Sequence, residues 1–219
     1  MNYELQTCAE LAHSYLFVML TTGLQSIIHN LQFIIDLDHR LLLAINHAHT
    51  PKLDRLMMFA SDRYVWFPAY ALLILWLVDI FRRRAWQLLL LLVGAVALAD
   101  SITSKLFKPF FARLRPCHAP GLLGQLHLPD GCGGQFGFLS SHAANSFALA
   151  FFLLLVLPSQ RFRALQITAF AWASLLSYSR IYLAAHYPSD VLGGALIGAG
   201  LGWGTAWVFR RWAPLAMRS

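Results

Sequence analysis

Charged residues are scarce in this chain of 219 residues: Asp, Glu, Lys and Arg together make up 12% of it, whereas hydrophobic types make up 58%. The mean hydropathy is +0.56. A soluble domain of this length does not have enough interior to bury so much apolar surface. The composition therefore excludes an ordinary soluble protein and indicates that a lipid bilayer is the solvent.

Cysteine is rare, and acidic residues are fewer than basic ones. Three cysteines are too few for a disulfide-rich scaffold. The chain has 17 Lys and Arg against 10 Asp and Glu, which gives a net charge of +7. The basic residues lie between apolar runs rather than in one patch, which favours loops at a membrane face over a nucleic-acid surface. We therefore expect no nucleic-acid partner, and the sequence indicates no obligate protein partner.

Apolar stretches recur along the chain, and each has close to the roughly 20 residues that a helix needs to cross a bilayer. Five are clear: 65–81, 86–107, 143–158, 164–184 and 190–209. A sixth, 14–35, is interrupted by polar residues, so it either spans the membrane or lies along its interface. The sequence predicts an all-α, polytopic membrane helix bundle with five clear transmembrane helices and a weaker sixth at the N-terminus. Because no repeat or linker interrupts residues 1–219, we expect a single domain.

Arginines cluster in the connections between alternate apolar stretches, and hence on one face of the membrane. They stand at Arg82, Arg83 and Arg84, at Arg161 and Arg163, and in the tail at Arg210, Arg211 and Arg218. The positive-inside rule makes this face cytoplasmic. The C-terminus is then cytoplasmic, while the region 108–142 and the turn near His186 lie on the extracytoplasmic face.

Glycines recur at four-residue spacing in the last apolar stretch. They are Gly194, Gly198 and Gly202, with Gly200 and Gly204 on a neighbouring row. Small residues at this spacing let two helices approach closely in a membrane. The pattern therefore predicts close helix packing rather than a ligand site.

Polar residues interrupt the apolar pattern in three segments, 108–116, 139–146 and 179–190. The predicted threading brings all three to the extracytoplasmic face. Gathered cations repel one another and lose hydration, so an anion is the natural partner, and the arginine fork matches phosphate oxygens. The sequence predicts a phosphate cradle made of Lys108, Arg115 and Arg180, with hydroxyl donors from Ser140 and Ser141.

Two histidines add chemistry to this cradle. His186 and Asp190 are four residues apart, which lets the carboxylate accept from one imidazole nitrogen and leaves the other free to attack phosphorus. His142 could protonate the departing oxygen. The set predicts phosphoryl transfer to histidine, then hydrolysis, with no metal required because the cations neutralise the developing charge. Taken singly, each residue has an ordinary structural explanation, such as a snorkelling cation or an N-cap serine.

Three motifs carry a resemblance to a known family. The first is Lys108 followed after six residues by Arg115 and Pro116, the second is Ser140, Ser141 and His142, and the third is Ser179 and Arg180 followed by His186 and Asp190. They resemble the signature motifs of the type 2 phosphatidic acid phosphatase superfamily, and the similarity covers about 36–209. That family includes membrane lipid phosphatases, bacterial acid phosphatases, glucose-6-phosphatase and vanadium haloperoxidases.

The resemblance implies a role for each residue. His186 would be the nucleophile, His142 the acid, and Asp190 the group that orients His186. The phosphate would be bound by Lys108, Arg115, Arg180, Ser140 and the backbone near Ser141. The family's usual second motif is Pro-Ser-Gly-His, whereas Leu139 and Ser141 stand here in place of the Pro and the Gly. This departure leaves the role of Ser141 open.

Two cysteines, Cys117 and Cys132, lie between the first two motifs, on the oxidising side of the predicted membrane. A disulfide between them would close a small loop and stabilise the fold by about 3 kcal/mol. Free thiols, or a metal site that uses His118 and His127, are the alternatives.

The sequence favours a metal-independent, cofactor-free phosphatase that acts on a lipid phosphate or diphosphate at the outer face of a bacterial cytoplasmic (inner) membrane. Undecaprenyl diphosphate is the favoured substrate, and phosphatidylglycerol phosphate, phosphatidic acid and lipid A are the alternatives. An anion channel or transporter would also use charged residues, but near the membrane midplane and often with an internal repeat. Vanadate-dependent oxidation would share the cradle but is typical of soluble relatives.

Overall fold

The computed structural model describes residue 25 and residues 29–212. The chain divides into two compact units, 1–41 and 42–219. In the first unit, residues 29–41 are helical, and the second unit opens with the end of the same helix, residues 42–47. Most of the predicted sixth span, 14–35, lies outside the described residues.

The second unit is built of helices joined by short turns and one long loop. Its longer helices are α2 (Pro51–Ser61), α3 (Phe67–Phe81), α4 (Ala85–Ser101), α6 (Ser141–Val156), α7 (Ser159–Tyr182) and α8 (Pro188–Trp212), and its shorter ones are η1 (Arg82–Arg84), η2 (Ile102–Phe107), α5 (Lys108–Phe111), η3 (Pro116–His118) and η4 (Pro120–Leu122). Within residues 29–212 there is no strand, only an isolated bridge between Leu114 and Phe136. The predicted all-α class is confirmed.

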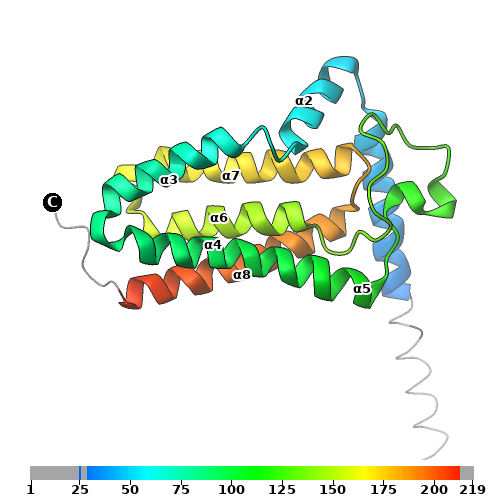
Figure 1. Ribbon diagram of the computed structural model, residues 1–219. Helices are drawn as coiled ribbons and strands as arrows, with labels where there is room; N and C mark the ends of the chain where they lie inside the picture. Colours follow the sequence, from blue (N-terminus) through cyan, green and yellow to red (C-terminus); the bar gives the residue numbers. More distant parts are fainter. Residues whose placement is uncertain (1–24, 26–28, 213–219) are drawn as a thin grey trace, which may run out of the picture. The chain divides into compact units, whose positions relative to one another are not determined.

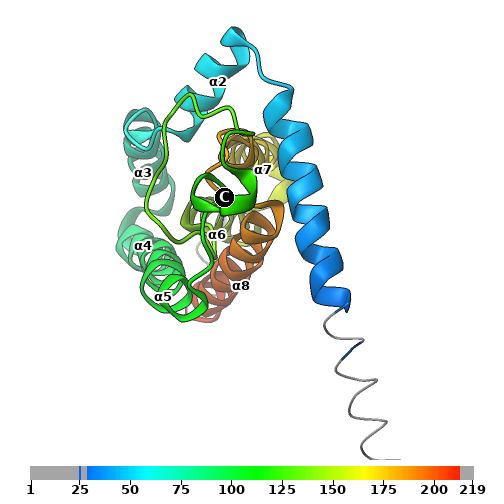
Figure 2. The same ribbon diagram turned by 90° about the vertical axis from the view of Figure 1, so that its right-hand side faces the viewer.

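Helix α6 lies at the centre of this unit, packed against α8, α7 and α4. Figures 1 and 2 show α3, α4, α7 and α8 arranged around it, with their axes roughly along one direction. The buried core is contributed by each of these helices and includes Leu77, Leu88, Phe152, Leu153, Ala173 and Phe209.

The glycines of α8 lie against the backbone of α6. A Cβ atom on Gly194, Gly198 or Gly202 would collide with the carbonyl oxygen of Ser140, Ala144 or Ala148, respectively. A Cβ atom on Gly200 or Gly204 would meet nothing within 4 Å. The glycine row predicted from the sequence is therefore a helix-packing surface, and it holds α8 close to the start of α6.

We expect Gly198→Ala to destabilise the protein by about 1–3 kcal/mol, because the added methyl group forces α8 away from the Ala144 carbonyl. The thermal unfolding midpoint of the purified protein in detergent measures this. Gly200→Ala is the matched control: the same change two residues away projects into open space, and replacing a helical glycine with alanine favours the helix. Equal midpoints for the two variants would contradict the packing assignment.

Two stretches of the described residues are long and apolar enough to cross a membrane: Phe67–Phe111 and Pro188–Trp212. The first contains both α3 and α4, which run in opposite directions on either side of η1 (Figure 1). Helix α6 is apolar but has only 16 residues, and α7 carries polar residues such as Gln166 and Arg180. The predicted total of five or six transmembrane helices is not confirmed.

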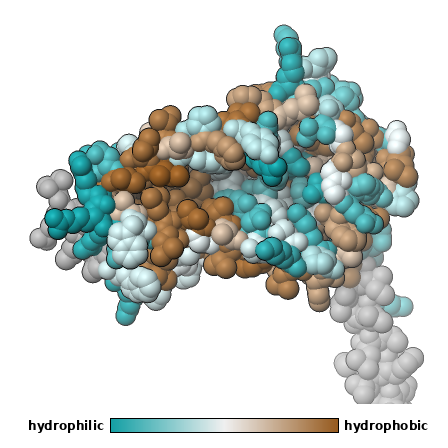
Figure 3. Space-filling model, viewed as in Figure 1, coloured by the Kyte–Doolittle hydropathy of each residue, from teal (hydrophilic) through white to brown (hydrophobic). Residues whose placement is uncertain are grey.

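Large apolar side chains are exposed on the outer faces of α3, α4 and α8. Leu72 and Leu75 of α3, Leu90 of α4 and Trp203 of α8 are each more than half exposed. Figure 3 shows hydrophobic side chains gathered over the face that α3 and α4 form. Surface of this kind on the outside of a helix bundle suits lipid rather than water.

Candidate active site

The long loop between α5 and α6 lies over one end of the bundle, as Figure 2 shows. Its two ends pair with each other through the backbone. The Arg115 N–H donates to the Gln135 carbonyl at 2.9 Å, and the Gly137 N–H donates to the Arg113 carbonyl at 2.9 Å. This pairing brings the first motif close to the start of α6, where the second motif lies.

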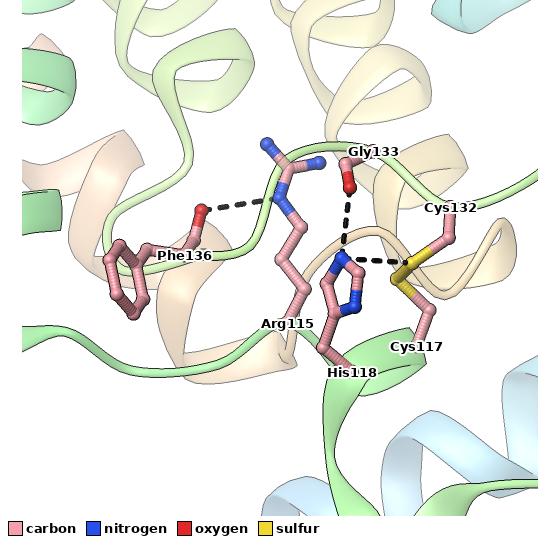
Figure 4. Close-up of a disulfide and its surroundings, with 6 residues drawn as sticks. All are labelled: Arg115, Cys117, His118, Cys132, Gly133 and Phe136. Atoms are coloured by element: carbon pink, nitrogen blue, oxygen red, sulfur yellow. Dashed lines mark hydrogen bonds between the residues drawn. A yellow bond between two sulfur atoms is a disulfide. The ribbon is translucent and has the colours of Figure 1, made fainter.

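A disulfide closes the loop further out. Cys117 and Cys132 are bonded, with Cα atoms 5.9 Å apart (Figure 4). Beside it, the His118 Nε2 lies 3.0 Å from the Gly133 carbonyl oxygen, and Arg115 Nε donates to the Phe136 carbonyl at 3.2 Å. A Cβ atom on Gly133 would come within 2.6 Å of the Arg115 guanidinium. The closed loop thus fixes the backbone against which Arg115 lies.

We expect a Cys117→Ser, Cys132→Ser double variant to lose about 3 kcal/mol of stability, because the bond joins residues 15 apart in sequence and restricts the unfolded chain. The check is the thermal midpoint with and without a reducing agent. The reductant should lower the wild-type midpoint toward that of the double variant and leave the double variant unchanged. A wild-type protein insensitive to reductant and equal to the variant would contradict a stabilising bond.

Three cations from three segments converge on one histidine. Lys108 begins α5, Arg115 lies in the loop, and Arg180 lies near the end of α7. The pKa of His186 lies well below its ordinary value, first because the ring is buried and then because the charges of Arg180, Arg115 and Lys108 act on it. Burial also lowers the pKa of Arg115, which the nearby Asp190 carboxylate partly offsets. The His186 imidazole is therefore neutral, which the predicted role of nucleophile requires.

Arg180 is 9% exposed and contacts α2, a helix that the sequence analysis did not connect with the site. Its Nη1 donates to the hydroxyl of Ser61, the last residue of α2. Its Nε has no hydrogen-bond partner within the described part of the chain. A buried guanidinium with an unused donor is ready to bind an anion.

The second motif forms the N-terminus of α6. Ser140 is the N-cap residue, and its hydroxyl oxygen accepts from the Ala143 N–H at 3.4 Å. Its own N–H donates to the Asp190 carbonyl oxygen at 3.0 Å, which ties the second motif to the third. His142, in the first turn, is half-buried and within electrostatic range of His186 and of the same three cations. Both histidines therefore face one positively charged site.

Asp190 is fully buried and contacts His186 less closely than the sequence predicts. The His186 Nδ1 lies 3.7 Å from the Asp190 Oδ2, beyond hydrogen-bond distance, and has no hydrogen-bond partner within residues 29–212. The Asp190 carboxylate instead accepts from the Tyr187 N–H at 3.0 Å and from Arg113 Nη1 at 2.6 Å. The bond to Tyr187 also caps the start of α8.

Arg113 is a site residue that the sequence analysis did not single out. It joins the first motif to the third, because its Nη1 donates both to Asp190 and to Ser189 Oγ, at 2.7 Å, and its guanidinium stacks on the Tyr187 ring. Its position two residues before Arg115 was the available signal. Ser61 contacts Arg180, and Thr103 contacts Ser141. No sequence signal indicated either contact, because Ser61 and Thr103 are isolated polar residues outside the motifs.

All three motifs lie within a stretch that matches a known family. The sequence model of the PAP2 superfamily matches residues 84–214. The chain belongs to the PAP2 superfamily. Membership confirms the resemblance seen in the sequence, and the chain is accordingly a phosphatase of the membrane lipid class.

Several members of the PAP2 superfamily are similar over most of the chain. A lipid A 4'-phosphatase of Bacteroides thetaiotaomicron is 38% identical over 179 residues, 79% of this chain and 77% of its own length. A lipid A 4'-phosphatase of Porphyromonas gingivalis is 33% identical over 175 residues, 77% of this chain and 71% of its own length. The crystal structure of LpxE from Aquifex aeolicus superimposes with a TM-score of 0.57 at 30% identity, covering 77% of this chain and 94% of that structure.

Proposed function

We propose that this protein removes a phosphate group from a lipid A-type glycolipid through a phosphohistidine intermediate, without a metal ion. The observation that carries the proposal is the convergence of Lys108, Arg115 and Arg180 on the neutral, buried imidazole of His186. Three cations can hold a phosphate dianion and neutralise the charge that develops on it during transfer. His142 lies at the same site, and once the phosphate dianion offsets the three cations it can carry the proton that the leaving group needs.

The reaction has two steps. In the first, the His186 Nε2 attacks phosphorus, since the Nδ1 faces Asp190. The bond between phosphorus and the lipid oxygen breaks, and His142 gives that oxygen a proton. In the second, His142 takes a proton from water, the hydroxide oxygen bonds to phosphorus, and the bond to His186 breaks to release inorganic phosphate. Asp190 stabilises the positive charge that His186 carries between the two steps.

The phosphate oxygens are held by donors from every motif. Lys108, Arg115 and Arg180 supply charged N–H groups. The hydroxyl oxygen of Ser140 is occupied as an N-cap acceptor, so its proton is available to the phosphate. The start of α6 adds backbone N–H groups and the positive end of the helix dipole.

The proposed arrangement in the membrane follows the sequence prediction. Five helices cross a bacterial cytoplasmic membrane, with arginine-rich connections and the C-terminus inside. The site then faces outward at the membrane interface. A lipid keeps its tails in the bilayer while its headgroup reaches the cradle.

A cavity beside Arg180 supports a sugar phosphate as the substrate. It has a volume of about 390 Å³, and its lining comprises Met58, Phe59, Ser61, Asp62, Val65, Asp130 and Arg180. Carboxylates such as those of Asp62 and Asp130 accept hydrogen bonds from sugar hydroxyl and amide groups. They repel the second phosphate of a diphosphate. The two lipid A 4'-phosphatases among the relatives support the same choice.

The test is phosphate release by the purified protein in detergent with EDTA, from lipid A, phosphatidylglycerol phosphate and undecaprenyl diphosphate. We expect kcat/KM for lipid A to exceed that for undecaprenyl diphosphate by about tenfold or more. An equal or higher value for undecaprenyl diphosphate, the substrate favoured from the sequence, would overturn the lipid A assignment. Loss of all activity in EDTA would overturn the metal-independent mechanism.

Asp130→Asn tests the cavity itself. Removing this charge should lower the ratio of kcat/KM for lipid A over undecaprenyl diphosphate by about three- to tenfold, because the second phosphate is no longer repelled. Asp79→Asn is the matched control, since Asp79 pairs with Arg82 at an exposed helix end away from the cavity. An unchanged ratio in Asp130→Asn would mean that the charge of this cavity does not determine substrate specificity.

A further inference from the structure

Lys108 is held by a chain of hydroxyl groups that the family resemblance does not explain. The Lys108 Nζ donates to Ser141 Oγ at 3.2 Å, and Ser141 Oγ lies 2.8 Å from Thr103 Oγ1. Thr103 Oγ1 in turn lies 2.7 Å from the Ala99 carbonyl oxygen. Thr103 is fully buried and Ser141 is 8% exposed. These three side chains belong to α5, α6 and η2, and the Ala99 carbonyl joins them to α4.

The chemistry of the groups orients every proton in this chain. A carbonyl oxygen can only accept, so the single Thr103 proton points to the backbone carbonyls of α4, at 2.7 Å to Ala99 and 3.2 Å to Asp100. The Thr103 oxygen is then left to accept from the Ser141 hydroxyl. An ammonium group can only donate, so the Ser141 oxygen accepts from Lys108. Each hydroxyl donates once and accepts once, and the chain ends on a fixed backbone carbonyl.

A π-helix makes this contact possible. Residues 102–107 form η2, and the Lys108 N–H donates to the Thr103 carbonyl five residues back. In a regular α-helix, residues five apart point about 140° away from each other. The wider π turn rotates Lys108 toward the face that carries Thr103, and both side chains reach Ser141. Such π turns are frequent at functional sites.

We infer that Ser141 and Thr103 are positioning residues that fix the Lys108 ammonium for phosphate binding. The inference rests on the proposed function, because it takes Lys108 as a phosphate ligand. The inference gives a role to Ser141, the serine that stands in place of the family's glycine. The Ser141 hydroxyl acts through Lys108, and its proton is directed to Thr103 rather than to the phosphate.

Orthovanadate, a phosphate mimic, serves as the probe, with its Kd measured by titration calorimetry on the full-length protein in detergent. We expect Thr103→Val, Ser141→Ala and Ser141→Gly to raise this Kd by about three- to tenfold, the effect of losing one hydrogen bond. Thr103→Ser keeps the hydroxyl and should recover most of the loss. Thr205→Val is the matched control, because Thr205 Oγ1 donates to the Leu201 carbonyl at 2.8 Å in the same manner, on α8.

Repeating the measurement in a Lys108→Met variant separates an effect on Lys108 from a general loss of structure at the site. In that background Thr103→Val should raise the Kd no further, because the group it positions is gone. An equal rise in both backgrounds, an unchanged Kd in Thr103→Val, or a loss of binding that Thr103→Ser does not recover would overturn the inference. If wild-type protein does not bind orthovanadate, or if Lys108→Met leaves the Kd unchanged, it is the proposed phosphate site that fails.

Discussion

Replacing His186 with alanine is expected to lower phosphate release from a lipid phosphate by at least about 10⁴-fold, because no bond to phosphorus can then form on the enzyme. The imidazole is buried at the point where the charges of Lys108, Arg115 and Arg180 meet. Phosphate release in detergent, with the elution profile of the variant as a check on folding, measures this loss.

His47→Ala is the matched control for that experiment. His47 lies at the end of the helix that precedes α2, where its Nε2 is 2.8 Å from the Gln125 carbonyl oxygen, outside the proposed site. We expect this variant to keep its activity within about twofold, as for a surface substitution. If His186→Ala retained substantial activity while folded, the phosphohistidine mechanism would be wrong.

The second large effect is expected for His142→Ala. A lipid alkoxide is a poor leaving group, so losing the residue that protonates it should lower lipid phosphate hydrolysis by about 10²–10⁴-fold. The 4-nitrophenolate ion leaves without a proton, so release of 4-nitrophenol from 4-nitrophenyl phosphate in the first turnover should fall far less. Rapid-mixing kinetics with the two substrates measure the difference.

The comparison between substrates is itself the control for this variant. A general loss of folding would lower both rates by the same factor, whereas loss of the acid lowers them by different factors. The second step also needs His142, as the base that takes a proton from water, so a burst of nitrophenol followed by slow turnover is expected. Equal losses for both substrates would contradict the assignment of His142 as the acid.

That these residues gather in one place could be predicted from the sequence, because their chemistry is unusual in an apolar chain. Lys108, Arg115 and Arg180 are cations at the ends of apolar stretches, and an anion is the simplest reason for gathering them. The glycine spacing in the last apolar stretch likewise predicted close helix packing, and the structure gives α6 as the partner helix. These inferences depend on residue types and spacing, which a sequence contains.

The partners of those residues could not be predicted, because they depend on how elements far apart in sequence approach one another. Arg113 is 77 residues from Asp190, and Ser61 is 119 residues from Arg180. The contact of Thr103 with Ser141 requires the π turn, for which the stretch ITSKLF gives no pattern. The sequence also placed the Asp190 carboxylate on His186, whereas its short contacts are to Arg113 and Tyr187.

The span count shows a different limit. Length and composition predicted five clear spans, yet α6 has 16 residues and α7 carries polar side chains. Both helices pack against others, and Gln166 of α7 donates to the Leu154 and Leu157 carbonyls at the end of α6. A helix shielded by its neighbours does not need the continuous apolar surface that the hydropathy criterion requires.

In the proposed mechanism, phosphate passes through a covalent bond to His186, and trapping that bond is the most direct test. Purified protein is mixed with lipid A labelled with ³²P at its 4'-phosphate, in EDTA, quenched with alkali within milliseconds, and digested for mass spectrometry. A phosphohistidine mechanism predicts an acid-labile, alkali-stable label on the peptide that contains His186. Label on another residue, or no label while phosphate is released at the full rate, would contradict the phosphohistidine mechanism.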